Sequence, residues 1–146
     1  HKKARIVEFS APKIIDSLGK ISYQVRIENI GNSFFKPEGK ITVKPLFGPA
    51  KLLELAPLNI LYSSTRKIDC LKNEGVVECQ MPGRVFLGPY KANLKFTADK
   101  EAQIYGKEFT TFAFPFSLIL GLITIGLILK IIAKILKKWN ILDIEF

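Results

Sequence analysis

The sequence predicts an all-β domain, built as an antiparallel β-sandwich and followed by a single transmembrane α-helix at the C-terminus. Three observations predict this architecture. Before residue 112, apolar side chains recur at every second position, which is the period of a strand with one buried face. Turn-forming residues separate these alternating segments. From Phe112 to Leu129 the chain carries no charged residue, which is typical of a membrane span.

The alternation is clearest in two segments. Ile21, Tyr23, Val25 and Ile27 alternate with polar residues, and the same pattern returns from Tyr90 onwards. Strands are expected near residues 4–10, 20–29, 39–47, 51–56, 65–70, 76–80, 84–87, 89–98 and 104–111. Many short strands with turn signals between them favour an immunoglobulin-like antiparallel β-sandwich.

Tyr90 stands at the start of a late, strongly alternating segment, directly after Gly88-Pro89. Sandwich domains often place a tyrosine at such a bend and bond its hydroxyl to nearby backbone, which is the tyrosine corner. We favour this interpretation over an ordinary core tyrosine. The domain has no tryptophan, because Trp139 follows the apolar segment, so an antibody-type domain is not expected.

Cys70 and Cys79 flank a segment that contains the turn-forming residues 73–75. They therefore stand on the two arms of a predicted hairpin, and a disulfide between them would close a short loop. A zinc site would need two further ligands, and the only histidine is His1. A redox pair usually has the tighter C-x-x-C spacing. A structural disulfide is the preferred interpretation.

The apolar C-terminal segment predicts a membrane anchor over residues 112–139, between a domain at 1–111 and a tail at 140–146. A helix from Pro115 to about Leu136 would be roughly 33 Å long, enough for a hydrocarbon core of about 30 Å. An amphipathic surface helix fits less well, because residues 112–129 offer no polar face. The expected inner membrane interface consists of Lys130, Lys134, Lys137, Lys138 and Trp139.

These lysines also predict the orientation. They gather at the C-terminal end of the span, so the positive-inside rule places the C-terminus in the cytoplasm and the domain outside the cell membrane. The sequence begins His1-Lys2-Lys3, as a mature chain would after removal of a signal peptide, although a trimmed sequence would look the same.

Small residues recur within the predicted anchor. Ala113, Ser117 and Gly121 are spaced by four, and Gly126 adds another. This spacing predicts a helix face that packs closely against another transmembrane helix. The chain would then be a subunit of a larger membrane assembly.

Several motifs resemble the membrane-proximal immunoglobulin-like domains of bacterial surface proteins, including the WxL-interacting proteins of Gram-positive bacteria. They are Asn29-x-Gly31-Asn32, Pro37-x-Gly39-x-Ile41-x-Val43, Phe47-Gly48, Asn59-Ile60-Leu61, Ser64-Thr65-Arg66 and Gly88-x-Tyr90-x-Ala92-x-Leu94. The resemblance covers most of residues 20–98 and the anchor. It implies an extracytoplasmic, non-catalytic binding domain that faces the cell wall.

Catalytic chemistry is not expected. His1 is terminal, so the serines at 63 and 64 lack an imidazole partner. No phosphate-binding glycine motif is present, and neither a cofactor nor a metal is expected. The net charge is +9, with basic residues concentrated in the first strands. These residues either attract anionic wall polymers or lipid head groups, or form a solvated face. No motif predicts nucleic-acid binding.

Two functions from different classes follow. The first is a cell-surface module that binds a wall polymer or a surface protein through its sandwich edges and loops. The alternative is an accessory subunit that is held in an integral membrane complex by its helix.

Overall fold

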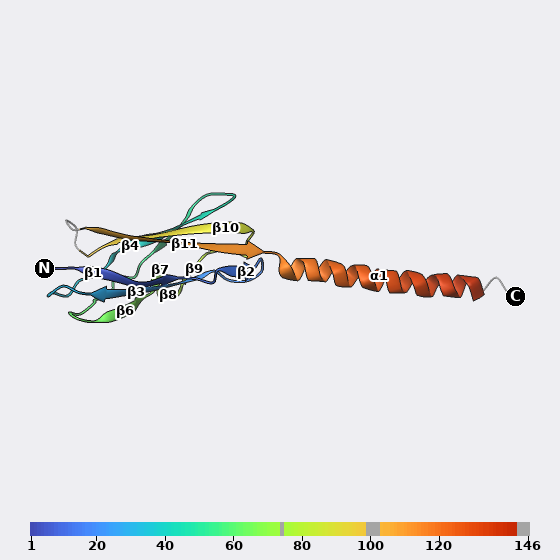
Figure 1. The fold of residues 1–146 in the computed structure, drawn as a ribbon, viewed down its shortest axis with the longest axis horizontal. Helices are drawn as coiled ribbons and strands as arrows, with labels where there is room; N and C mark the ends of the chain where they lie inside the picture. The colour runs from blue at the N-terminus through green and yellow to red at the C-terminus, as the bar shows by residue number, and fades with distance from the viewer. Residues whose placement is uncertain (74, 99–102, 143–146) are drawn as a thin grey trace. The chain divides into compact units, whose positions relative to one another are not determined.

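The computed structural model describes residues 1–73, 75–98 and 103–142. The chain divides into two compact units, His1–Phe114 and Pro115–Phe146. The first unit is built of strands and the second contains one helix (Figure 1). The predicted order, a β-rich domain followed by a long apolar helix, is confirmed.

The β-unit contains two main sheets, which lie as two layers in Figure 1. In the first sheet, β3 (Ser22–Asn29) pairs on one side with β1 (Ala4–Ser10) and on the other with β6 (Thr65–Ile68) and β9 (Cys79–Gln80). The second sheet has the order β2-β11-β10-β4-β5. Its strands are β2 (Ile14–Asp16), β4 (Glu38–Pro45), β5 (Lys51–Glu54), β10 (Gly88–Thr97) and β11 (Ile104–Phe114). A small hairpin joins β7 (Cys70–Lys72) to β8 (Gly75–Val77).

The core lies between the two sheets and is formed by the alternating positions. Tyr23, Val25 and Ile27 of β3 are fully buried, and so are Ile41 and Val43 of β4. In β10 the buried side chains are Tyr90, Ala92, Leu94 and Phe96. Intervening residues of these strands are exposed or half-buried, as a period of two requires.

One predicted strand is absent from the structure, and one strand of the structure was not predicted. Residues 84–87 do not form a strand; instead, Phe86 is buried and its N–H donates to the carbonyl of Ser17 at 2.8 Å. The short strand β2 was not predicted. It pairs with β11 in parallel, whereas the other strand pairs of the main sheets are antiparallel.

The boundary between domain and anchor lies later than residue 111. Strand β11 continues to Phe114, and α1 spans Phe116–Leu142. Ala113 therefore belongs to the sheet, where it pairs with Gly88 and is only 1% exposed. Its predicted place on a helix-packing face is wrong. Ser117, Gly121 and Gly126 do lie in α1, which is long and apolar enough from Phe116 to Trp139 to cross a membrane.

One buried polar group has a testable consequence. The Tyr23 hydroxyl lies in the core with no hydrogen-bond partner among the described residues, and its ring stacks on Phe9. Burial, and secondarily the nearby Tyr90 hydroxyl, raises the pKa of Tyr23 well above its usual value of 10.0.

Replacing Tyr23 with phenylalanine is expected to leave stability unchanged or slightly raised at neutral pH, because the removed hydroxyl is unsatisfied. Above pH 10 the unfolded wild type loses the phenolic proton while the folded wild type keeps it, so wild-type stability falls as pH rises. The advantage of Tyr23→Phe should therefore grow by up to about 1.4 kcal/mol per pH unit. Urea unfolding of the two detergent-solubilised chains from pH 8 to 11 measures this difference in unfolding free energy. A difference that stays constant over this pH range would contradict the prediction.

Candidate functional site

Two loops meet at the end of the β-unit that lies away from Phe114, and a buried asparagine holds them together. Asn29 is fully buried at the end of β3. Its Nδ2 donates to the carbonyls of Ser33 at 2.9 Å and Ile60 at 3.0 Å, and its Oδ1 accepts from the N–H of Gly31 at 3.0 Å. One amide therefore fixes both the loop after β3 and the loop before β6. Buried polar groups that are satisfied in this way make loops rigid.

A backbone bridge completes this arrangement. Phe35 and Ile60 exchange N–H···O bonds of 3.2 and 2.8 Å, and both side chains are buried. In an antiparallel bridge, the residue before Phe35 stands opposite the residue after Ile60. These two residues are Phe34 and Leu61.

The flanking side chains point outward. Phe34 is 61% exposed, Leu61 is 59% exposed and the following Tyr62 is 66% exposed. The tight turn after Tyr62 is held by Ser64, whose Oγ donates to the carbonyl of Leu61 at 2.6 Å. We call Phe34, Leu61 and Tyr62 the loop-end patch. It presents two aromatic rings and one aliphatic side chain on a backbone that is held by Asn29 and by the Phe35–Ile60 bridge.

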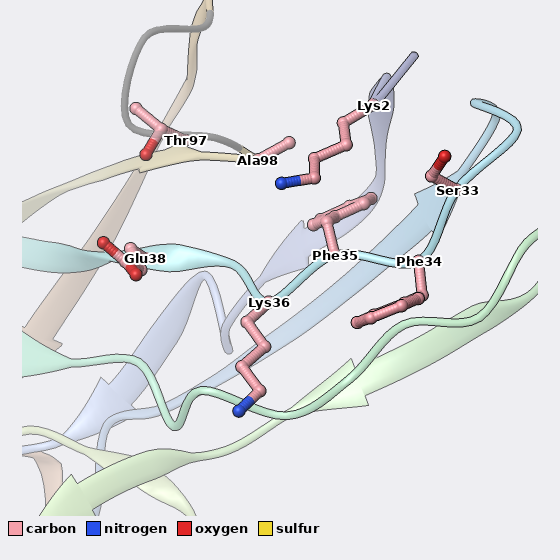
Figure 2. A pocket seen from close by; sticks show the side chains of 8 residues that line it. All are labelled: Lys2, Ser33, Phe34, Phe35, Lys36, Glu38, Thr97 and Ala98. Atoms are coloured by element: carbon pink, nitrogen blue, oxygen red, sulfur yellow. The ribbon is translucent and has the colours of Figure 1, made fainter.

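A cavity of about 380 Å³ lies beside this patch. Figure 2 shows the Lys2 side chain reaching toward the gap between Phe35 and Ala98, whereas Lys36 points away from it. The remaining lining residues are Ser33, Phe34, Glu38 and Thr97. This combination suits an apolar group that carries a polar or negative substituent.

A second hollow of about 690 Å³ lies between the β5 edge and the β7–β8 hairpin. Its lining includes the apolar residues Leu52, Leu71 and Val77. The charged residues Glu78 and Arg84 line it as well. Neither hollow contains a histidine or a free cysteine. Within residues 1–73, 75–98 and 103–142, His, Cys, Asp and Glu form no group of three that could hold a metal. The lining of both hollows combines apolar side chains with a few charged ones, which suits a binding site.

The other predicted site residues are placed as follows. Cys70 and Cys79 are joined by a disulfide. The Tyr90 hydroxyl accepts a hydrogen bond of 3.1 Å from the N–H of Leu87, three residues upstream, which is the contact expected of a tyrosine corner. The residues predicted for the inner membrane interface all lie at exposed positions of α1: Lys130, Lys134, Lys137, Lys138 and Trp139.

The basic residues of the first strands are partly neutralised. Arg5 donates to Glu28 through Nε at 2.8 Å, and Arg26 lies 3.4 Å from Glu8. These cross-strand pairs favour a solvated face over a polyanion site at this surface.

Sequence reasoning missed the loop-end patch. The motifs found in the sequence include Asn29 and Leu61 but neither Phe34 nor Tyr62. A signal was present: Phe34 and Phe35 are adjacent aromatics between turn residues, where neither strand alternation nor a helical period accounts for both.

Comparison with known proteins identifies no family. No family model matches the chain, and no curated protein matches it. Among solved structures, the chain is similar to the Pseudomonas fluorescens alkylpurine DNA glycosylase AlkC bound to DNA containing an abasic site analog, with a TM-score of 0.51 and 13% identity. The match covers 75% of this chain but only 30% of the glycosylase chain. A likeness at this identity concerns the fold alone.

Proposed function

We propose that this chain is a single-pass membrane protein whose immunoglobulin-like domain stands outside the cell and binds a surface protein through the loop-end patch. The observation that carries the proposal is the exposure of Phe34, Leu61 and Tyr62 on loops fixed by Asn29. Aromatic side chains on rigid supports are the usual anchors of protein interfaces. A rigid support also lowers the ordering cost of binding.

The membrane placement is supported by α1. Its apolar stretch from Phe116 to Trp139 contains 24 residues, and its lysines gather toward the C-terminal end. The positive-inside rule then gives an outer domain and a cytoplasmic C-terminus. Within the domain, the loop-end patch lies at the end opposite Phe114, the last residue before the helical unit. In this orientation we expect the patch to be available to a partner at the cell surface or in the wall.

The chemical character of the patch favours a protein over an anionic wall polymer. Its three side chains carry no charge, and of the two lysines that line the neighbouring cavity, Lys2 and Lys36, the second points away from it (Figure 2). A polymer rich in phosphate would be held mainly by clustered cations. The DNA named for the glycosylase is not carried over to this chain, because the likeness concerns the fold alone.

An accessory-subunit function is the second candidate, and α1 supports it. A Cβ atom added at Gly121 or Gly126 would meet nothing within 4 Å in this chain. The helix surface at both glycines is therefore unoccupied and carries no side chain, so another helix could approach it closely.

Paired variants should distinguish the two functions. In the full chain, Phe34→Asp with Tyr62→Asp is expected to weaken partner affinity roughly 30-fold or more, the loss typical of a hot-spot residue worth about 2 kcal/mol. Val76→Asp, at an exposed apolar position of the β7–β8 hairpin, is the matched control and should retain binding. The measurement is co-purification from native membranes in gentle detergent, with mass spectrometry of the associated proteins.

The variant Gly121→Ile tests the alternative. Partners that survive Gly121→Ile but are lost from the loop-end variant support the binding module. Partners lost from Gly121→Ile and retained by the loop-end variant would instead establish an accessory subunit held by its helix.

A further inference from the structure

We propose that the end of the β-unit where β11 terminates docks on the lipid surface, with Leu46 and Phe47 inserted among the head groups. We call this the exit end and define it by residues 12–20, 44–51, 82–89 and 110–114. The inference rests on the proposed membrane span. It adds a second membrane contact, made by the domain itself.

The sheet topology brings these four segments together. Strand β2 pairs with the last residues of β11, and the Ser17 N–H donates to the carbonyl of Phe114 at 3.1 Å. Residue 88 pairs with Ala113. Tyr90 pairs with Pro45, so the β4–β5 loop begins near the start of β10, at the same end of the sheet. In Figure 1 this loop turns outward from the sheet.

The Leu46-Phe47-Gly48-Pro49 loop carries the most exposed apolar side chain of this end. Leu46 packs over Gly88, since its Cδ2 lies 3.4 Å from the position of a Cβ there. Gly48 has a φ of 96°, which a residue with a side chain rarely adopts, so the chain reverses directly after Phe47. Phe47 is 75% exposed, so little of its ring is covered by the domain.

Other apolar side chains accompany this loop. Those exposed at the exit end are Ile14, Leu18, Leu46, Phe47, Val85, Leu87, Phe112 and Phe114. Single exposed apolar residues are common on soluble domains, but a group drawn from four segments at one end marks an interaction surface.

The charge of the exit end fits an anionic lipid surface. Its exposed basic residues are Lys13, Lys20, Lys44, Lys51 and Arg84, and its acidic residue is Asp16. One Asp16 oxygen accepts a hydrogen bond from the N–H of Leu18 at 2.9 Å. Basic side chains around an apolar tip are the combination that binds peripheral segments to anionic membranes.

Chain connectivity identifies lipid as the occupant. Only Pro115 separates Phe114 from Phe116, the first residue of the apolar span. Two residues of extended chain reach about 7 Å. The head-group layer on each side of a bilayer is itself about 5–7 Å thick. If α1 enters the hydrocarbon at Phe116, the end of β11 must lie at the level of the head groups.

The test uses tryptophan as a depth reporter in the full chain. Trp139 is the chain's only tryptophan, so the wild type reports on α1. In a Trp139→Phe background, Phe47→Trp reports on the exit end and Phe34→Trp reports on the opposite end of the domain. Each protein is reconstituted in vesicles of phosphatidylcholine and phosphatidylglycerol that carry bromine on the acyl chains near the head groups.

We expect position 47 to lose most of its fluorescence to the bromines while position 34 loses little. Equal, weak quenching at positions 47 and 34, with strong quenching of Trp139, would overturn the docking and leave the span intact. Protection of position 47 from aqueous acrylamide without bromine quenching would mean that a protein, such as a second copy, covers this end, and would also overturn it. Absence of quenching at Trp139 would overturn the membrane span and the docking together.

Discussion

Replacing Gly39 with alanine is expected to destabilise the β-unit by about 3 kcal/mol or more, the upper range for overpacking a core. A Cβ at Gly39 would lie 2.2 Å from the carbonyl oxygen of Lys95 and 2.4 Å from the Cβ of Phe96. Both atoms belong to β10, which is the central partner of β4. Neither atom can move aside without moving the backbone of β10, whereas the end of a flexible side chain could.

Relief of this clash would have to disturb the centre of the second sheet. Phe96 stands opposite Gly39 in the register, is buried, and stacks on Tyr105 with ring centroids 5.3 Å apart. Moving β10 away from β4 would also break the alignment of Leu94 with Ile41, both fully buried. We therefore expect loss of cooperative unfolding at a temperature where the wild type is folded.

Gly106→Ala is the matched control. Gly106 lies in β11 of the same sheet, and the atom nearest to an added Cβ is the Leu94 carbonyl oxygen at 3.6 Å, an ordinary contact. The control should differ from wild type by less than about 1 kcal/mol, because alanine also restricts the unfolded chain. Thermal unfolding in detergent, followed by near-ultraviolet circular dichroism, compares the three chains. Equal midpoints for both variants would refute the close packing at Gly39.

The core was predictable because its physical cause is local. In β3 and β10 the apolar residues alternate with polar ones, so the buried face follows from the period of two. The same reasoning could not place β2, whose three residues pair with a strand almost a hundred positions later. Pairing at such distance depends on tertiary contacts that no short pattern records.

The start of the anchor, predicted at residue 112, was placed too early for a different reason, although the helix itself was expected from Pro115. Phe112, Ala113 and Phe114 are apolar, and both a sheet and a lipid bilayer accept apolar residues. Composition therefore could not separate the end of β11 from the start of α1. Pro115, which lies between them, was the better marker, because proline is favoured at helix starts and cannot donate to a ladder.

The loop-end patch escaped sequence analysis because two distant loops form it. Phe35 and Ile60 are 25 positions apart, and their bridge places Phe34 opposite Leu61. Asn29 looks in the sequence like one more turn residue, although its amide bonds to both loops. The identity of these residues is local information, but their proximity is a property of the fold.

Removing the disulfide by Cys70→Ala with Cys79→Ala is expected to lower the free energy of unfolding by about 2.5 kcal/mol, the loop-closure value for a loop of this size. The bond closes a separation of nine residues. It also connects the two sheets, because Cys70 bridges Leu55 beyond the end of β5 while Cys79 pairs with Tyr23 of β3. Both cysteines are buried, so a small cavity penalty adds to the loss.

Urea unfolding of the detergent-solubilised chain, with and without reductant, measures the effect. Reductant should lower the midpoint of the wild type toward that of the double variant and leave the variant unchanged. A variant with the wild-type midpoint would show that the bond contributes nothing, and a reductant effect on the variant would indicate another cause.

The double cysteine variant also tests whether partner binding depends on the stability of the domain. Asn29, which fixes the loop-end patch, lies six residues from Tyr23 along β3, about 20 Å in a strand. Below its unfolding transition, the double variant should therefore keep its affinity for a partner bound at the patch, although it unfolds more readily. If binding were lost while the domain stayed folded, the partner would have to contact the hollow beside the β7–β8 hairpin, and the binding site would move to that side of the domain.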